Sequence, residues 1–482
     1  MARQVAVVGV GSHTWRGGDA PEPLAMWDAV TRAAVADTEV AALEHLDSID
    51  IVYCQTWQYD APVDRLCDRL GISPRRRHYS GIGGTTPQVL VQDAAARITS
   101  GETDVALVVG AEALDTQRRY RKAGERAQYS FKPEVRPAFP WEAPFHPAEV
   151  AHEVFQAWLT FALFDNARRG RVGTGLDEYR SALGEQWHRF SQVAAANPEA
   201  WFRSERSAQE IVTPTATNRM VGYPYTKYMI SIMDVDMAAA VILMSDERAD
   251  ALGVARDRRV YLRGWRYATD PVYVAEHPDL SRSPAMREVT DGALTAAGVG
   301  IDDVAHLDLY SCFGSSVNFM RDALGIEPDE SRPLTVTGGL PYHGGAGSDY
   351  LTHAIAQMVR VLRADPGSFG LVTGVGMHMT KHVAGVYSTV PGAVNAPPPA
   401  SVPATVTVVD RYEGIATVAT ASVVHGGDGE PAWGVAVCDL PSGERCYARI
   451  EAADLLADAE SEEWVGRTVA IALTGDVNMV IA

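Results

Sequence analysis

The chain contains 482 residues, of which 46% are hydrophobic and 21% are charged, and it carries a formal net charge of −19. This length predicts two or three domains with a large buried core. The acidic balance argues against nucleic acid or an anionic membrane surface as a partner, because both require a basic face. We expect no membrane span, because no stretch approaches about 18 uninterrupted apolar residues, and no signal peptide, because the N-terminus lacks its apolar segment.

The five cysteines are odd in number and scattered, which predicts neither a disulfide framework nor a zinc-type site. Cys438 and Cys446 fall in a β-rich region, where they either face each other or stay apart as two reduced thiols. His378 and His382 are four residues apart, but their surroundings predict a loop and a strand rather than one helix face, so we expect no metal site. Together these features predict a reducing, cytoplasmic compartment.

Strand and helix patterns alternate in the first part of the chain. Three short apolar runs have the pattern of buried strands: residues 4–10, 48–54 and 104–113. Residues 23–38 repeat apolar residues at helical spacing, and residues 83–101 predict a second helix that Gly101 ends. This alternation predicts α/β architecture.

Residues 116–232 differ in texture, with a basic, aromatic and proline-rich stretch followed by two long amphipathic helical patterns. They predict a large helical insertion that lies over an α/β unit. The following α/β part repeats the first in outline, since GGAGSDYLTHAIAQMV is similar to GGTTPQVLVQDAAARI, and FGLVTGVGM to DVALVVGAEA. The repeat indicates a duplicated architecture with halves at residues 1–258 and 259–390.

The C-terminal part has a different pattern from both halves. Residues 391–403 are rich in proline and predict an extended linker. Residues 404–482 contain five short alternating strand patterns with glycine turns and one acidic helical pattern. Five strands with one helix predict a small OB-like β-barrel.

The loop HYSGIGGTTPQ (residues 78–88) holds three glycines and leads directly into a predicted helix. Backbone N–H groups at such a helix entry bind anions or carbonyl oxygens, and the same position lowers the pKa of a thiol nucleophile. The loop itself contains no strong nucleophile. It therefore either only binds a ligand or belongs to a family whose chemistry normally starts at this position.

Five ordered segments resemble the thiolase superfamily. GGTTPQVLVQDAAARITSGETDVALVVGAE matches its first-half helix and strand, DVDMAAAVILMS matches the strand that re-enters the core, and DLYSCF, TGGLPYHGG and TGVGM follow the order of its second-half catalytic motifs. Within the superfamily, the chain is most similar to the sterol-carrier-protein-x type and to thiolase-like proteins of type 1, which carry an additional C-terminal domain. The resemblance implies a five-layer αβαβα fold.

Thiolases use an acyl-carrying cysteine at the helix entry, an Asn or His after a strand, a His in a Gly-His-Pro motif, and a second cysteine in a Cys-x-Gly motif. The resemblance puts Gly84, Tyr310, His343 and Gly374 at these four positions. Both cysteines are then absent, so cysteine-dependent thiolysis or Claisen condensation is not expected. The chain resembles an acetyl-CoA acetyltransferase with a degenerate site.

The predicted catalytic residues are Tyr310, Tyr342 and His343. The resemblance implies this role, because thiolase relatives that cleave steroid side-chain thioesters by retro-aldol chemistry also lack the cysteine and use tyrosines near these motifs. A tyrosine beside a histidine acts as general acid or base if its pKa is tuned. The alternative is that both tyrosines are core residues with satisfied hydroxyls. Cys312 is expected to pack as a small buried hydrophobe.

The predicted binding residues bring backbone N–H groups, or a positive charge, to a thioester ligand. They are Gly83, Gly84, Thr85, Gly338, Gly339, Gly374, Gly376, Arg118 and Arg119. The two arginines follow the strand that ends at Gly110, where ligands of α/β sheets gather. They either meet the phosphates of coenzyme A or form a solvated helix face.

The resemblance leaves three hypotheses for function. The protein binds a CoA thioester and processes the acyl group without a cysteine intermediate, or it is a lyase that performs retro-aldol chemistry on a β-hydroxyacyl-CoA with Tyr310, Tyr342 and His343. In the third hypothesis it is a non-catalytic CoA-ester-binding protein or subunit. In each case the ligand is coenzyme A or an acyl-CoA, no cofactor is bound tightly, and the protein is a monomer or a homodimer.

Overall fold

The computed structural model describes residues 3–18, 20–140, 145–394 and 401–481. The first half contributes five strands in the order β3-β2-β4-β7-β1. They are β1 (Val5–Thr14), β2 (Ser48–Ile51), β3 (Arg76–Tyr79), β4 (Val105–Ala113) and β7 (Asp236–Ser245). All residues of β4 and β7 are buried, as expected of continuous apolar runs in the middle of a sheet covered on both faces.

The second half adds four strands in the order β8-β11-β10-β9. They are β8 (Val260–Thr269), β9 (Val304–Asp308), β10 (Phe369–Gly376) and β11 (Lys381–Ser388). Strands β1 and β8 pair in antiparallel fashion at Ala6–Tyr261 and Val7–Val260. The strands of both halves are therefore joined by hydrogen bonds into one nine-stranded sheet.

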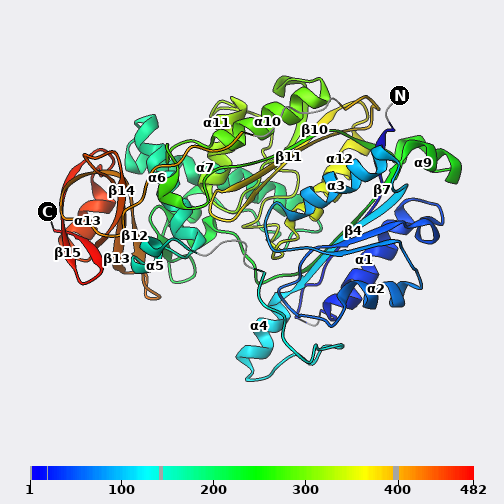
Figure 1. The fold of residues 1–482 in the computed structure, drawn as a ribbon, viewed down its shortest axis with the longest axis horizontal. Helices are drawn as coiled ribbons and strands as arrows, with labels where there is room; N and C mark the ends of the chain where they lie inside the picture. The colour runs from blue at the N-terminus through cyan, green and yellow to red at the C-terminus, as the bar shows by residue number, and fades with distance from the viewer. Residues whose placement is uncertain (1–2, 19, 141–144, 395–400, 482) are drawn as a thin grey trace.

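Helices form three layers around the strands of the two halves. They are α1 (Pro23–Asp37), α2 (Pro62–Leu70), α3 (Thr86–Ser100), α9 (Asp246–Leu252), α10 (Pro284–Ala297), α11 (Gly314–Leu324) and α12 (Tyr350–Ala364). Helices α3 and α12 lie between the two sets of strands, α1 and α2 cover the outer side of the first set, and α10 and α11 cover the second (Figure 1). This arrangement confirms the five-layer αβαβα architecture. Helix α3 ends at Gly101, whose φ is +79°.

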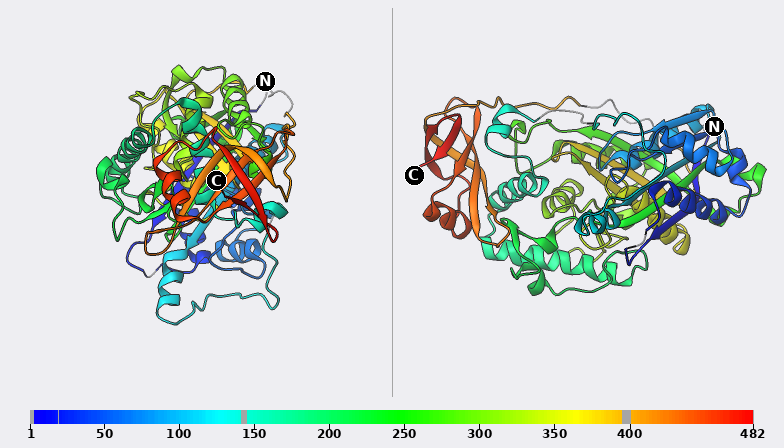
Figure 2. Two further views of the ribbon diagram at one scale, coloured as in Figure 1. Left: turned by 90° about the vertical axis from the view of Figure 1, so that its left-hand side faces the viewer. Right: turned by 90° about the horizontal axis from the view of Figure 1, so that it is seen from below.

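The insertion after β4 is mainly helical, as predicted. It forms α4 (Leu114–Lys122), α5 (Pro147–Ala151), α6 (Ala157–Val172), α7 (Leu176–Ala196) and α8 (Ala208–Val212), and a hairpin of β5 (Met220–Gly222) and β6 (Tyr225–Thr226). Helix α4 projects away from the core, whereas α5, α6 and α7 lie on the side toward the C-terminal barrel (Figures 1 and 2). The hairpin was not predicted, because its strands are only 3 and 2 residues long and make no alternating pattern; β5 also pairs with β12 of the barrel at Gly222–Val424.

The C-terminal part is a closed five-stranded barrel. Its elements are β12 (Gly414–His425), β13 (Pro431–Asp439), β14 (Arg445–Ile450), α13 (Ala453–Ser461), β15 (Thr468–Thr474) and β16 (Val477–Val480). The strands follow the order β13-β14-β16-β15-β12, and pairing of β12 with β13 closes the ring. The predicted five strands and one helix are thus confirmed. The barrel stands at one end of the molecule, beside α5 and α6 (Figure 2).

The barrel is fixed to the core by buried polar contacts. Thr420 Oγ1 donates to the carbonyl of Leu163 on α6, and Asn166 Nδ2 donates to the carbonyl of Ala421 at 2.8 Å. Inside the barrel, Cys438 and Cys446 are direct partners in the register of β13 and β14, and both are buried free thiols. They therefore face each other across the two strands, and no disulfide bond joins them in this structure. Helix α6 links the barrel to the site described below.

Two absences hold for the described part of the chain. No helix there combines the length and the apolar character that a membrane crossing requires. No group of three or more His, Cys, Asp and Glu side chains in the same ranges is arranged to hold a metal ion.

Candidate functional site

Loops from both halves meet at a cavity of about 300 Å³, which we call the Gly84 cavity. Its walls come from the entry of α3, the segment after β9, the end of β10, the loop before α12, and helix α6. The lining residues are Gly84, Ala157, Trp158, Phe161, Ile230, Ser231, Met233, Tyr310, Cys312, Phe313, Leu340, Gly345, Gly347, Val375, Gly376 and Met377. Ligands of α/β sheets gather beyond the carboxyl ends of strands, and β9 and β10 both end here.

Gly84 has no room for a side chain. A Cβ atom built on it would lie 2.2 Å from the carbonyl oxygen of Val375 and 2.4 Å from the hydroxyl oxygen of Tyr310. The tyrosine hydroxyl thus fills the space beside the position that the resemblance assigns to the thiolase nucleophile. A cysteine at residue 84 would require both neighbours to move.

Two hydrogen-bond donors remain open at this point. The amide of Gly83 donates to Ser348 Oγ at 3.0 Å, but the N–H of Gly84 and the hydroxyl of Tyr310 form no hydrogen bond with any described residue. Burial raises the pKa of Tyr310 above its ordinary value of 10. The phenol therefore stays protonated near neutral pH and acts as a donor rather than as a base.

Hydrogen bonds to the backbone of Tyr310 and a contact with its ring fix the position of this residue after β9. Its backbone N–H donates to Thr373 Oγ1 at 3.0 Å, and its carbonyl accepts from Ser316 Oγ at 2.9 Å. Tyr350, the first residue of α12, meets the ring edge-on with the ring centroids 5.6 Å apart. This packing fixes the direction in which the hydroxyl points.

Tyr342 and His343 do not line the Gly84 cavity. The Tyr342 ring meets Trp187 of α7, and its hydroxyl is buried without a hydrogen-bond partner among the described residues. His343 is 2% exposed and lies beside His353, with the ring centroids 5.4 Å apart. Burial lowers the pKa of His343 to about 4, so it is a neutral core histidine. The structure brings Tyr310 to Gly84 but keeps these two predicted catalytic residues away from it.

Gly338 and Gly339 also face away from the cavity. Their φ angles of +107° and +77° form a tight turn against α7. Their amides donate to the hydroxyls of Thr335 and Thr337, at 3.0 Å and 3.1 Å. Because both N–H groups are used inside the turn, they are not available to a ligand, and the residues shape the loop instead.

The remaining predicted binding residues divide into two groups. Gly376 lines the cavity, and the Thr85 hydroxyl packs close to it. Gly374 is buried in β10, where an added Cβ would meet Leu351 and Val383, so it packs the sheet. This placement of Gly374 differs from its predicted role as a ligand contact.

Arg118 and Arg119 lie on α4, outside the Gly84 cavity. Both form ion pairs with Asp115, and Arg118 also pairs with Asp234 at 3.2 Å. Their charges are therefore already balanced within the chain. Neither arginine lines the Gly84 cavity, so neither contacts a ligand bound there.

Several lining residues escaped the sequence analysis. Trp158 and Phe161 come from α6, Met233 from the segment before β7, and Met377 from the turn after β10. Met377 has a φ of +55°, which is the left-handed region and unusual for a residue with a side chain. An apolar residue at helical spacing looks the same in sequence whether it faces a core or a ligand. Nothing in the sequence indicated that the backbone of Met377, after the glycine motif, adopts the left-handed conformation.

Cys312 contributes its thiol to the cavity wall. The side chain is 9% exposed, and its Sγ lies 3.6 Å from Ser316 Oγ. Burial raises the pKa of this thiol to about 12. At neutral pH it is a protonated thiol and not a nucleophilic thiolate, which agrees with the prediction that it packs as a small buried residue.

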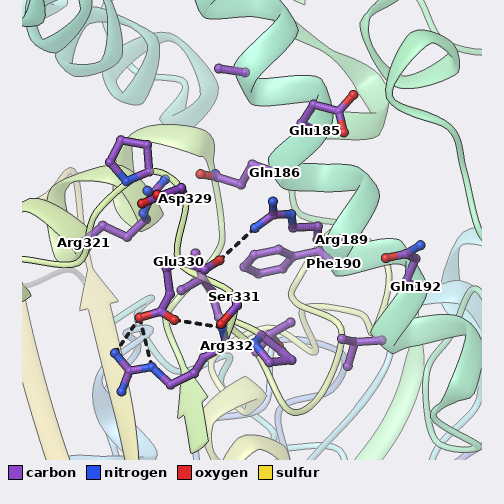
Figure 3. A pocket seen from close by; sticks show the side chains of 16 residues that line it. Glu185, Gln186, Arg189, Phe190, Gln192, Arg321, Asp329, Glu330, Ser331 and Arg332 are labelled. Atoms are coloured by element: carbon purple, nitrogen blue, oxygen red, sulfur yellow. Dashed lines mark hydrogen bonds and ion pairs between the residues drawn. The ribbon is translucent and has the colours of Figure 1, made fainter. Parts of the chain in front are cut away.

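A second cavity of about 510 Å³ lies between α7 and residues 328–335 (Figure 3). Its most prominent charges satisfy one another: Arg332 forms an ion pair with Glu330, and Arg189 donates to the carbonyl of Glu330 at 2.9 Å. The predicted site residues do not line it. It is therefore a less suitable site than the Gly84 cavity.

Comparison with known proteins bears on the family and the fold. No protein family model matches the sequence. A crystal structure described as a monomeric SCP2-thiolase like protein type 1 from Mycobacterium smegmatis is 30% identical, with a TM-score of 0.87, and the alignment covers 100% of this chain and 99% of that one. A structure described as the Ltp2-ChsH2(DUF35) aldolase has a TM-score of 0.62 at 18% identity and covers 79% of this chain and 97% of that one, which supports the fold alone.

Curated relatives match a shorter region. A 3-ketoacyl-CoA thiolase from Enterobacter sp. (strain 638) is 33% identical over 153 residues, which cover 29% of this chain and 33% of the relative. The chain thus matches about a third of the length of these relatives. The full-length similarity to the M. smegmatis protein is what decides the family: the chain belongs to the thiolase superfamily and, within it, to the SCP2-thiolase-like proteins of type 1.

Proposed function

We propose that the protein binds a CoA thioester with the acyl end in the Gly84 cavity and without forming an acyl-cysteine. The observation that carries this proposal is the pair of open donors, the Gly84 N–H and the Tyr310 hydroxyl, beside an apolar pocket. Two preorganised donors suit a thioester carbonyl oxygen, because they stabilise negative charge on it. The apolar and thioether side chains around them suit a short acyl group.

The lining of the cavity favours binding over turnover. Among the described lining residues there is no Asp, Glu, His or Lys, so no ordinary general base stands beside the donors. The Cys312 thiol is held protonated by burial. The chain therefore lacks the parts of the ping-pong acyl transfer that its thiolase relatives perform, and we infer that it holds an acyl-CoA rather than cleaves it by thiolysis.

A retro-aldol lyase is the second candidate. In that reaction the bond between the α and β carbons of a β-hydroxyacyl-CoA breaks, the β-hydroxyl loses its proton, and the electron pair moves to the thioester oxygen as an enolate. Tyr310 and Gly84 would stabilise that oxygen, and one structural relative is described as an aldolase. The role for Tyr342 and His343 is not supported by their positions, so the proton acceptor in this candidate would be solvent or the substrate itself.

Calorimetric titration with acetyl-CoA tests the proposal, and Tyr310→Phe is the variant to compare. Loss of one neutral donor should weaken binding about five- to tenfold, whereas Tyr342→Phe, in the loop before α12 and outside the cavity, should leave it unchanged. Absence of any saturable binding by CoA esters would refute the proposal. Release of an aldehyde or ketone from a β-hydroxyacyl-CoA, lost in Tyr310→Phe, would favour the lyase instead.

Two further tests address activity and oligomeric state. Acetoacetyl-CoA with free CoA should give no acetyl-CoA, and turnover that Cys312→Ala abolishes would overturn the inactive-thiol assignment.

The related M. smegmatis structure is described as monomeric, and we propose a monomer here as well. Light scattering of the full chain should then give a mass close to 52.0 kDa.

A further inference from the structure

The cavity of about 510 Å³ between α7 and residues 328–335 contains polar groups that the described chain leaves unsatisfied (Figure 3). We call it the α7 cavity. One wall is the face of α7 between Ala182 and Val193, and the others are Arg321 of α11 and residues 328–335. Its volume lies within the range of small-molecule sites. Because it shares no lining residue with the Gly84 cavity, it is a candidate for a different ligand.

Gln186 contributes a side-chain amide that has no hydrogen-bond partner. The side chain points from α7 toward Arg321 and Asp329 (Figure 3). The residue is 9% exposed, and its Nε2 atom is buried without a partner among the described residues. A buried amide without a hydrogen bond is unfavourable. Because half a turn about the last side-chain bond exchanges the oxygen and the nitrogen, this amide can offer either atom to a ligand.

Arg321 is a cation that has no carboxylate partner in the described ranges. Asp322, the next residue, is held by Arg168 at 2.7 Å and by Arg171. The guanidinium of Arg321 instead donates to the carbonyl of Glu327 at 2.8 Å, and its Nε atom is buried without a partner. Burial, together with the charge of Arg168, lowers the pKa of Arg321. An anionic group beside this guanidinium would therefore stabilise its charge.

Arg189 brings a second positive charge to the cavity. It donates to the carbonyl of Glu330 at 2.9 Å and forms no ion pair within the described part of the chain. Its charge also contributes to the lowered pKa of Arg321. Arg332, the third arginine of the lining, is paired with Glu330 at 2.6 Å. Two arginines without counter-ions therefore remain, and guanidinium groups bind carboxylates through paired hydrogen bonds.

Two carboxylates of the lining also have no partner. The side chains of Glu185 and Asp329 are exposed and form no ion pair or hydrogen bond with any described residue. With Glu330 included, three carboxylates face three arginines around the cavity. Equal numbers of both signs do not favour a multiply charged anion. They favour a small ligand whose positive and negative charges each meet an opposite charge.

The wall between these charged groups is apolar. Phe190 is 2% exposed and lines the cavity from α7, together with Val193. Pro333 and Leu334 line it from the opposite segment. The hydrogen bond from Arg189 to the Glu330 carbonyl ties that segment to α7. The two walls thus offer a fixed apolar surface to a ligand, which loses little freedom in the protein when the ligand enters.

We propose that the α7 cavity binds a free amino acid that has an apolar side chain. Its carboxylate meets Arg321 and the amide of Gln186, and its ammonium group meets the exposed carboxylate of Asp329 (Figure 3). Its side chain packs against Phe190. This ligand satisfies the unpartnered amide, the unpaired cation and the unpaired carboxylate together. The inference does not depend on the proposed function, because the two cavities have separate linings.

The experiment is a calorimetric titration of the full chain with L-phenylalanine and L-leucine. We expect saturable binding with a Kd of about 1 mM or lower. Two further probes each lack one charge of L-phenylalanine: 3-phenylpropionate has no ammonium group, and 2-phenylethylamine has no carboxylate. Each should bind at least about tenfold more weakly, because it loses one charge-assisted contact.

Gln186→Met separates a role in ligand binding from a role in folding. Methionine has a similar volume and no unsatisfied amide, so the free energy of unfolding should stay equal or rise, while the affinity for L-phenylalanine falls about five- to tenfold. Arg321→Gln should lower that affinity about tenfold. Gln209→Met and Arg203→Gln are the matched controls, because both residues are exposed and lie outside the cavity, and both variants should bind like the wild type.

Three results would overturn the inference. The first is no saturable binding of either amino acid up to about 10 mM. The second is binding of 3-phenylpropionate as tight as that of L-phenylalanine, and the third is wild-type affinity in Gln186→Met or in Arg321→Gln. Acetyl-CoA should bind to all four variants as it does to the wild type, so a failure at the α7 cavity is distinct from a failure at the Gly84 cavity.

Discussion

The Gly84 cavity and the cavity of about 730 Å³ beside α4 differ in the chemistry of their linings. The first is lined mainly by apolar and sulfur-containing side chains and offers two neutral donors, whereas the second is lined by four cations and two carboxylates. Neutral donors in an apolar pocket suit a thioester carbonyl, and unpaired cations suit phosphate. The first lining suits the acyl end of a CoA thioester, and the changes to Gly84 and Met377 described below alter that lining.

The largest effect should come from filling the space at Gly84. Gly84→Ala forces a Cβ atom against the Val375 carbonyl and the Tyr310 hydroxyl, and we expect it to lower the free energy of unfolding by about 2–3 kcal/mol. Gly427→Ala is the control, because nothing lies within 4 Å of its added Cβ. Urea unfolding of both variants measures the difference. Equal stabilities would show that residue 84 has room for a side chain.

The buried carboxyl of Glu112 should make the stability of the protein depend on pH. Burial raises the pKa of Glu112 from 4.5 to about 7, so the folded state favours the protonated carboxyl. That stability is fully present below pH 4.5 and is lost as the pH rises through 7. We expect Glu112→Gln to gain about 2 kcal/mol relative to the wild type between pH 5 and pH 8.

Denaturant unfolding at several pH values checks this expectation. The exposed Glu178 on α7 provides the control, because Glu178→Gln should follow the wild-type curve at every pH. A Glu112→Gln curve that also runs parallel to the wild type would show that this carboxyl is ionised in the folded protein across the whole range.

The size of the Gly84 cavity should depend on Met377. Met377→Gly removes a side chain from the wall and relieves a left-handed φ of +55°. Affinity for a butanoyl thioester should then rise about tenfold relative to acetyl, since each of its two additional CH₂ groups contributes about 0.8 kcal/mol when buried. Met379→Gly relieves a similar φ of +60° at a residue outside the wall and should not change the preference. The measurement is the affinity of each variant for a series of acyl thioesters of increasing chain length. The same chain-length preference in Met377→Gly and Met379→Gly would contradict the account.

The sequence revealed more of the fold than of the site. Alternating strand and helix patterns, Gly101 at the end of α3, and five strand patterns near the C-terminus are local features, and the structure bears them out. The hairpin at β5 and β6 was missed because its strands are only 3 and 2 residues long, and the pairing of β5 with the distant strand β12 left no mark in the sequence. Secondary structure set by local spacing is readable, while pairing set by distant contacts is not.

The site shows the same limit at the level of single side chains. Motif order put Gly84 and Tyr310 at two of the family's catalytic positions, and in the structure both residues line one cavity, with the Tyr310 hydroxyl beside Gly84. It could not say that Tyr342 turns toward Trp187, since that direction depends on the tight turn at Gly338 and Gly339. Nor could it separate the ion-paired Arg118 from the unpaired Arg121 on the same helix.

The central claim is that Tyr310 donates a hydrogen bond to a bound thioester carbonyl. Infrared difference spectroscopy with acetyl-CoA, labelled with ¹³C at the thioester carbonyl, tests it directly, with Tyr342→Phe as the control for loss of a buried tyrosine outside the cavity. We predict that the carbonyl band of the bound ligand shifts to lower wavenumber in the wild type and in Tyr342→Phe, and that Tyr310→Phe loses most of this shift. An identical band in Tyr310→Phe and the wild type would contradict the account.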